Sequence, residues 1–158
     1  MTFKTGPIGG LVVKELLVHK DGRGWLSELF RSDELSAEYL PAMAYVSSTQ
    51  PGVARGPHEH RDQADLFCFI GPGTFRITCW DNRKSSPTYG NTVTLEAGEG
   101  NPLSVLVPAG VVHGYKNIAD KDGWVMNLPN RLYAGKNKRE PVDEIRHEHD
   151  PNSQFKLD

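Results

Sequence analysis

The sequence has 158 residues, of which 37% are hydrophobic, and it contains 16 glycines and 11 prolines. This length allows one globular domain with a substantial core, and the Gly and Pro content predicts many turns. Its 18 Lys and Arg residues nearly balance 20 Asp and Glu residues, which argues against general binding to nucleic acid or to an acidic membrane surface.

The first ten residues, MTFKTGPIGG, lack the apolar core of a signal peptide. No apolar run further along approaches the roughly 18 residues that a membrane span needs. We therefore expect a cytoplasmic protein with no membrane partner.

From residue 10 onward, short runs rich in β-branched and aromatic residues alternate with Gly, Pro, Asn and Asp turn signals. This pattern is typical of half-buried strands. The runs lie at residues 10–20, 43–49, 65–71, 74–81, 91–97, 103–109 and 124–129. Many short strands favour a sandwich or barrel, and a jelly roll is a standard way to close such a sheet. Cys68 and Cys79 lie within these runs, where buried free thiols are expected.

Only residues 31–40, RSDELSAEYL, show a helical, amphipathic pattern, so we expect one or two short helices in total. We expect a single domain over residues 1–158. From about residue 134 the chain is polar and charged, which predicts a solvated tail or a short helix lying on the barrel. His147 and His149 in that segment are expected to be solvated.

The segment RGPHEHRDQAD, residues 55–65, gathers titratable side chains. In an extended segment His58 and His60 project from the same face, because side chains alternate with period two. Asp65 follows closely, and His113 occurs later in PAGVVHGYKN. Two kinds of chemistry are open to such residues: they could bind a metal ion, or they could move protons on a bound substrate.

The spacing of these residues resembles the two sequence motifs of the cupin superfamily. The stretches concerned are Gly52-x5-His58-x-His60-x4-Asp65 and Pro108-x-Gly110-x2-His113-x3-Asn117. The resemblance implies an all-β fold, a cupin-type double-stranded jelly-roll β-barrel. In metal cupins three histidines and a carboxylate bind the ion, which here would be His58, His60, Asp65 and His113. Because Asp65 is shorter than the motif's glutamate, we expect no cofactor and keep one divalent transition metal as the alternative.

A narrower resemblance covers nearly the whole chain, from about Val12 to Glu140. Five stretches in order are similar to those of the dTDP-4-dehydrorhamnose 3,5-epimerase family: DGRGWLSELF (21–30), RGPH (55–58), WDNRKSSPTYG (80–90), VPAGVVHGY (107–115) and NLPNRLYAG (127–135). The resemblance implies an isomerase of dTDP-sugar and polysaccharide biosynthesis. Its substrate would be a dTDP-4-keto-6-deoxyhexose, and it would act as a homodimer.

The same resemblance implies roles for individual residues. His58 would be the catalytic base and Tyr133 the general acid on the opposite face of the sugar. Arg55 would meet enolate or diphosphate charge. Substrate contacts would come from His60, Asp65 and His113, and nucleotide contacts from Arg23 and Glu28 reaching across to a neighbouring subunit.

Two departures from the family pattern keep other functions open. Asp65 stands where the family has a lysine that steadies the enolate, and the chain lacks the later segment that supplies the base's carboxylate partner. The stretch RGPHEHR also resembles that of cupin sugar-nucleotide 3,4-ketoisomerases, in which both histidines, here His58 and His60, lie in the site. The alternatives are such a ketoisomerase, or a metal-dependent or non-catalytic ligand-binding cupin.

Overall fold

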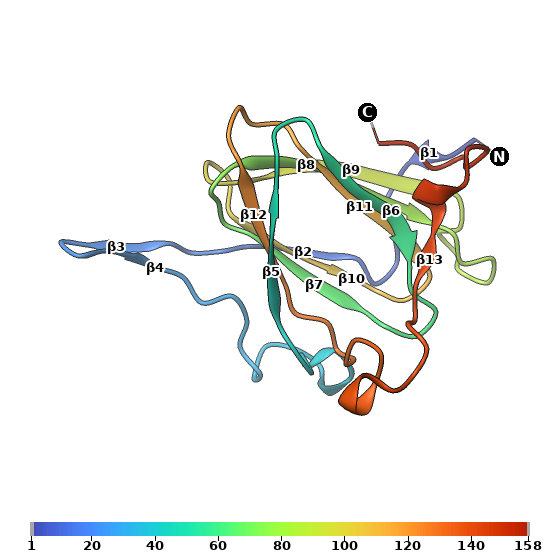
Figure 1. The fold of residues 1–158 in the computed structure, drawn as a ribbon, viewed down its shortest axis with the longest axis horizontal. Helices are drawn as coiled ribbons and strands as arrows, with labels where there is room; N and C mark the ends of the chain where they lie inside the picture. The colour runs from blue at the N-terminus through green and yellow to red at the C-terminus, as the bar shows by residue number, and fades with distance from the viewer. Residues whose placement is uncertain (1, 158) are drawn as a thin grey trace.

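The structure is a computed structural model that describes residues 2–157. Two β-sheets pack face to face, and every strand pair except β1–β9 is antiparallel (Figure 1). The six-stranded sheet has the order β1 (Lys4–Thr5), β9 (Asn91–Gly98), β8 (Thr74–Asp81), β11 (Val111–Asn117), β6 (Ala54–Glu59) and β13 (Ile145–Arg146). The five-stranded sheet has the order β2 (Val12–Glu15), β10 (Leu103–Val107), β7 (Asp65–Phe69), β12 (Gly123–Asn127) and β5 (Tyr45–Thr49). This is the jelly-roll β-barrel of the cupin type, which confirms the expected fold class.

A third, two-stranded sheet lies apart from the barrel. It is the hairpin of β3 (His19–Asp21) and β4 (Gly24–Leu26), which projects from the barrel at the left of Figure 1. We call residues 19–26 the N-terminal arm. Trp25 and Leu26 on this arm are 57% and 58% exposed, so no apolar surface of the same chain covers them.

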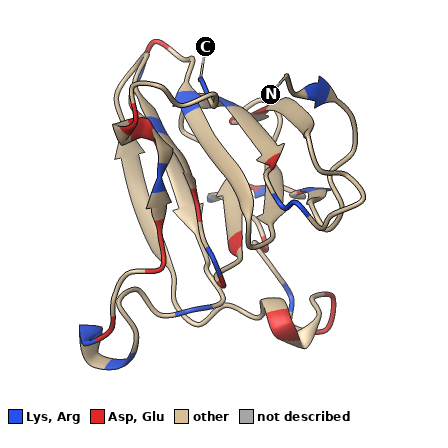
Figure 2. Cartoon of the chain, turned by 90° about the vertical axis from the view of Figure 1, so that its right-hand side faces the viewer, with Lys and Arg blue, Asp and Glu red and all other residues tan. Residues whose placement is uncertain are grey.

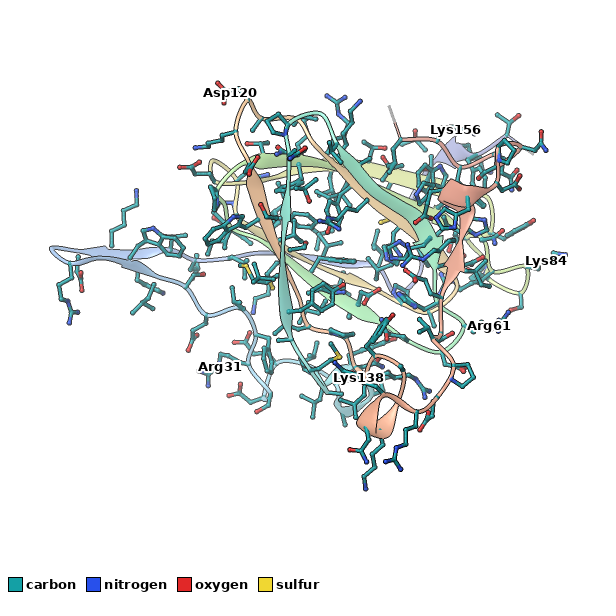
Figure 3. All side chains as sticks on the ribbon, viewed as in Figure 1. Arg31, Arg61, Lys84, Asp120, Lys138 and Lys156 are labelled. Atoms are coloured by element: carbon teal, nitrogen blue, oxygen red, sulfur yellow. The ribbon has the colours of Figure 1, made fainter. Side chains whose placement is uncertain are left out.

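The main core fills the space between the two sheets, where side chains from both sheets meet (Figure 3). Strand β7 is buried along its whole length, which explains why DLFCF is an uninterrupted apolar run after its first residue. Phe67 and Phe69 point from it into the main core, while Leu66 and Cys68 point to the other face. Cys68 and Cys79 are both buried free thiols, as expected.

Segments at either end of the chain cover the outer faces of the sheets. Residues 16–39 cover the outer face of β7 and β10, which they contact through Leu16, Leu29 and Leu35. On the six-stranded sheet, Phe155 packs against Trp80 and Val112. We call residues 143–157 the C-terminal strap. Of the two alternatives expected for this segment, a solvated tail is wrong, and the chain lies on the barrel as a two-residue strand and 3₁₀ turn instead of a short helix, held there by buried Phe155 and several specific polar contacts.

The helical prediction for residues 31–40 is wrong. Within the described chain this stretch forms turns and one 3₁₀ turn, η1 (Ala37–Tyr39). A ten-residue helix is marginal without tertiary support, and here Leu35 and Tyr39 gain their burial from a turn-rich path over the sheet. Two other 3₁₀ turns are η2 (Lys136–Lys138) and η3 (His147–His149).

Charges of both signs are interspersed over the strands and loops of the face shown in Figure 2. In the described chain, no helix is long and apolar enough to cross a bilayer.

Candidate active site

Two neighbouring strands bring the first pair of histidines together. His58 on β6 lies opposite His113 on β11, and their ring centroids are 4.5 Å apart. The register of the two strands shifts between His113 and Tyr115. Gly56 permits this close passage: its φ is +83°, and a Cβ there would lie 2.7 Å from the His113 carbonyl oxygen. Gly56 of the RGPH stretch therefore allows His58 to lie beside His113.

His60 and Asp65 complete the cluster from the loop after β6 and the first position of β7. Asp65 Oδ2 lies 3.1 Å from His60 Nε2 and 3.3 Å from His113 Nε2. One ligand atom from each of the four residues His58, His60, Asp65 and His113 lies within 4.8 Å of the others. The structure therefore assembles the whole set that the sequence motif suggested.

The Asp65 carboxylate is almost completely buried, and its two oxygens have different surroundings. Oδ1 accepts hydrogen bonds from Asn127 Nδ2 at 2.8 Å and from Gln63 Nε2 at 3.0 Å. Burial alone would raise the pKa of Asp65, but pairing with His113 and His60 lowers that pKa well below its ordinary value. The carboxylate is thus anionic across the physiological range.

His58 is held neutral. Burial, and then the positive charge of His113 and of His60, lower the pKa of His58 to about 2. Its Nδ1 lies 3.9 Å from Oε1 of Glu144, which precedes β13 on the C-terminal strap. The sequence comparison led us to expect no carboxylate partner for this histidine, and Glu144 corrects that expectation.

These side chains open into a cleft of about 990 Å³. His58, His60 and Tyr133 all line it, together with Tyr45 and Glu144. Tyr45 is a second phenol in the cleft; its oxygen accepts a hydrogen bond from Asn127 Nδ2 at 3.0 Å, and burial raises its pKa. The cleft is large enough for a hexose with part of a nucleotide.

The remaining predicted residues lie elsewhere in this chain. Arg55 is held at the edge of the barrel by Thr49 Oγ1 at 2.9 Å and the Ser48 carbonyl at 2.7 Å, and it does not line the cleft. Arg23 is at the tip of the N-terminal arm, paired with Asp21. Glu28 pairs with Arg31 beside a separate pocket against β2 and β10.

The strap also contributes contacts that sequence reasoning missed. The backbone carbonyl of Asp143 contacts His60 Nδ1, and the Asp143 carboxylate accepts the backbone N–H groups of Arg61, Asp62 and Gln63 at 2.8–2.9 Å. His147, expected to be solvated, contacts Glu59 Oε1 at 2.9 Å. None of these strap contacts had a signal in the sequence, whereas Asn127 on β12, which was also missed, is a polar residue within an apolar run.

A barrel with a neutral histidine, a carboxylate partner and phenols around a sugar-sized cleft defines a cupin-fold isomerase site. The model of the dTDP-4-dehydrorhamnose 3,5-epimerase family matches residues 5–144, and the chain belongs to this family of isomerases.

The relatives agree with this membership. The chain is 38% identical over 122 residues to the probable low-salt glycan biosynthesis epimerase Agl13 of Haloferax volcanii, covering 77% of this chain and 78% of that protein. It is 39% identical over 113 residues to the spore coat polysaccharide biosynthesis protein SpsL of Bacillus subtilis, covering 72% and 74%. The fold matches a dTDP sugar isomerase from Desulfovibrio desulfuricans G20 with a TM-score of 0.80 at 20% identity, covering 94% and 91% of the two chains.

Proposed function

We propose that this protein epimerises a dTDP-linked 4-keto-6-deoxyhexose by removing and returning a proton next to the C4 ketone. The observation that carries the proposal is that His58 and Tyr133 line one cleft of about 990 Å³ in a member of the epimerase family. A ketone at C4 acidifies the protons on C3 and C5, so acid–base groups on two sides of the ring suffice for inversion.

His58 is proposed as the base, because a neutral imidazole has a lone pair to accept a carbon-bound proton. A pKa of about 2 in the free protein means that its own proton affinity is low. Glu144 would compensate: its carboxylate, 3.9 Å from His58 Nδ1, can orient the ring and stabilise the imidazolium formed. Glu144 is therefore a positioning residue in this proposal.

Tyr133 is proposed as the acid that returns the proton on the opposite face. Tyr45 lines the same cleft and has a similar phenol, so it is the natural competitor for this role. Tyr45 is, however, tied to Asn127 and through it to Asp65, whereas Tyr133 is 57% exposed and free to meet a substrate.

The charged residues expected to contact substrate keep those roles as proposals. His60, Asp65 and His113 form the floor of the site, whereas Arg55, held by Thr49 and Ser48, would have to turn toward the cleft to meet the substrate. Asp65 in place of a lysine leaves an anion where the enolate would form, so this site needs a positive charge from another source.

Arg23 and Glu28 would reach the nucleotide only from a second copy of the chain, and a homodimer is therefore part of the proposal. Such an interface could use the exposed apolar residues of the arm and of the five-stranded sheet, which include Trp25, Val46 and Trp124. The two free thiols are compatible with a reducing cytoplasm, the compartment we propose.

A sugar-nucleotide 3,4-ketoisomerase is the second candidate. The observation in its favour is that His60 shares the cleft with His58, with ring centroids 5.4 Å apart. Such an enzyme moves a proton between neighbouring carbons instead of inverting centres.

The test is incubation with dTDP-4-keto-6-deoxyglucose in D2O, followed by NMR of the product. An epimerase incorporates deuterium at C3, at C5 or at both with the ketone still at C4, whereas a ketoisomerase moves the ketone to C3. Product formed without any deuterium would end the proton-abstraction mechanism.

Single substitutions test which residue is the base and which is the acid. His58→Asn should abolish exchange while nucleotide-sugar binding persists. Tyr133→Phe should allow exchange but slow inversion by about 100-fold or more, since the proton returns from the wrong face. Tyr45→Phe is the matched phenol control and should retain most of the inversion; the reverse outcome would transfer the acid role to Tyr45.

A further inference from the structure

The residue between His58 and His60 faces away from the site. Glu59 follows His58 on β6, and because side chains alternate along a strand, its carboxylate lies on the outer side of the six-stranded sheet. Its side chain is only 11% exposed. A carboxylate buried to this extent needs hydrogen-bond donors. Two segments far apart in the sequence supply them, the loop after β8 and the C-terminal strap.

The two segments meet at one oxygen of Glu59. Asn82 Nδ2 donates a hydrogen bond to Glu59 Oε1 at 3.0 Å, and His147 Nε2 lies 2.9 Å from the same oxygen. A carboxylate only accepts hydrogen bonds, so His147 Nε2 carries a proton here. We call Asn82, Glu59 and His147 the outer latch. It spans β11, the strand that lies between β8 and β6 in the sheet.

A buried carboxylate fixes the loop end of the outer latch. Asp81, the last residue of β8, is fully buried, and its Oδ2 accepts hydrogen bonds from Ser86 Oγ at 2.7 Å and Thr88 Oγ1 at 2.6 Å. Its Oδ1 accepts one from Arg83 Nε at 2.8 Å. These bonds hold the chain on both sides of Asn82. No residue of the stretch WDNRKSSPTYG, all of which the structure describes, lines the cleft, so the latch gives this family stretch a role outside the cleft.

The strap end of the outer latch lies just beyond Glu144. Asp143 holds the chain before Glu144 through the backbone N–H groups of residues 61–63, and His147 holds it three residues after. Between these points the strap joins β6 through only the two residue pairs of β13 (Figure 1). Arg146 forms ion pairs inside the strap, which do not attach it to the barrel. The latch is therefore the polar side-chain contact that fixes the strap after Glu144.

From these contacts we infer that Glu59 is a positioning residue for the base. Its bonds to Asn82 and His147 fix the direction of the strap. The fixed strap keeps the Glu144 carboxylate 3.9 Å from His58 Nδ1. A side chain is aimed precisely only when the backbone on both sides of it is held, and without the latch Asp143 alone would hold it. The inference rests on the proposed function, in which Glu144 supports His58.

The first measurement follows the strap without any substrate. Glu59→Ala removes the acceptor of the outer latch, whereas His147→Phe keeps a ring against Phe155 and removes the donor. In both variants, amide hydrogen exchange of peptides covering residues 143–149 should become about tenfold faster, as expected when a hydrogen bond to a charged group is lost. Exchange rates equal to those of the wild type in both variants would overturn the inference.

Two further variants control this measurement. Glu59→Gln keeps an acceptor oxygen and should stay within about threefold of the wild-type exchange rate. Glu99→Ala is the matched control, because it removes a carboxylate that pairs with Lys121, outside the strap, and it should leave the exchange of residues 143–149 unchanged. Thermal melts confirm that each variant is folded. If Glu59→Ala is not folded, His147→Phe decides alone.

The second measurement determines whether Glu59 acts through Glu144. In the deuterium-exchange assay, Glu59→Ala should lower kcat by about tenfold, because the carboxylate beside His58 is no longer held in place. In the Glu144→Gln protein the same substitution should lower kcat by less than about twofold, because the group that it positions is already gone. A residue that only stabilises the fold would cause the same loss in both proteins, and that result would overturn the inference.

The two proposals fail separately. Wild-type protein that never exchanges deuterium would refute the proposed function, while faster amide exchange in Glu59→Ala would still show that Glu59 holds the strap. Wild-type protein that exchanges deuterium, together with a Glu59→Ala variant that keeps both the protection of the strap and the wild-type kcat, would refute the outer latch and leave the epimerase proposal intact.

Discussion

The N-terminal arm and the C-terminal strap are both short, polar segments outside the barrel, but only the strap packs against it. The arm carries a stretch that matches the family closely, but in this chain it projects away and exposes Trp25 and Leu26 (Figure 1). The strap has no recognisable motif, but it is anchored by Phe155 and places Glu144 beside His58. If the proposed homodimer forms, the arm's motif would serve the neighbouring subunit, whereas the strap contacts the cleft of its own chain.

The largest effect should come from ending the chain at Val142. The loss of Phe155 from its cluster costs about 3 kcal/mol, and the loss of the Asp143 bonds adds about 1–2 kcal/mol. We therefore expect the free energy of unfolding to fall by about 4–5 kcal/mol, with activity below detection. Urea denaturation measures the first quantity and the deuterium-exchange assay the second.

A single change, Phe155→Ala, separates anchoring from chemistry in that truncation. It should reproduce most of the stability loss while retaining activity at low temperature, because Glu144 remains. Equal loss of activity in both variants would mean that the strap acts only through its anchor.

The next effect is expected from Glu144→Gln. The amide keeps the shape but removes the charge that stabilises an imidazolium on His58, so kcat should fall by about 100-fold, equivalent to about 2.7 kcal/mol. The melting temperature should change little. Glu148→Gln is the matched control, because Glu148 also pairs with Arg146 but makes no contact with His58. An unchanged kcat in Glu144→Gln would remove the strap from the chemistry.

A smaller effect is expected from Asp143→Asn. Burial alone would raise the pKa of Asp143, but three backbone N–H groups lower it below 3.8. We expect the variant to lose about 1–2 kcal/mol of stability at pH 7, after allowance for solvent screening. Because the folded-state pKa is the lower one, this stabilisation is complete above the unfolded-state pKa and disappears as the pH falls through the folded-state pKa.

Chemical denaturation of Asp143→Asn and wild type at a series of pH values tests this sign. The difference between the two proteins should be constant near neutrality and shrink in acid. A difference that grows as the pH falls would show that the Asp143 carboxylate is not the acceptor that holds the loop at residues 61–63.

The strands with strong apolar alternation were predictable from sequence, and two of the most important strands were not. Strands β6 and β11, which carry His58 and His113, are diluted by Gly56, Pro57 and Gly114 and lack the periodicity of half-buried strands. Those residues are there because the two strands pass so closely that a Cβ at Gly56 would meet the His113 carbonyl. The spacing of the motif residues predicted the cluster around His58 and His113, although the hydrophobic periodicity did not predict the two strands that carry these histidines.

The contribution of the strap could not be predicted, because it depends on contacts across some eighty residues of sequence. Asp143 and the backbone of residues 61–63 meet only after β13 pairs with β6, through two residue pairs. A two-residue strand in a charged segment has no detectable pattern. The composition of the strap indicated solvent exposure, and its packed apolar residues, Phe155 and Leu157, are too few to give a core signal in the sequence.

The smallest effect on the chain itself should come from the arm. Trp25→Ser removes a large side chain that contacts no core of its own chain, so the free energy of unfolding of the isolated subunit should change by no more than about 0.5 kcal/mol. If the arm packs on a second copy, the same variant should weaken the dimer and raise KM, because Arg23 would no longer reach the nucleotide. Analytical ultracentrifugation across a concentration series measures the dimer, and Trp80→Ser is the contrasting control, since Trp80 is buried within the chain and its loss should destabilise the monomer. A Trp25→Ser variant that lowers subunit stability as much as Trp80→Ser would mean that the arm folds back on its own barrel, and the contrast between arm and strap would no longer hold.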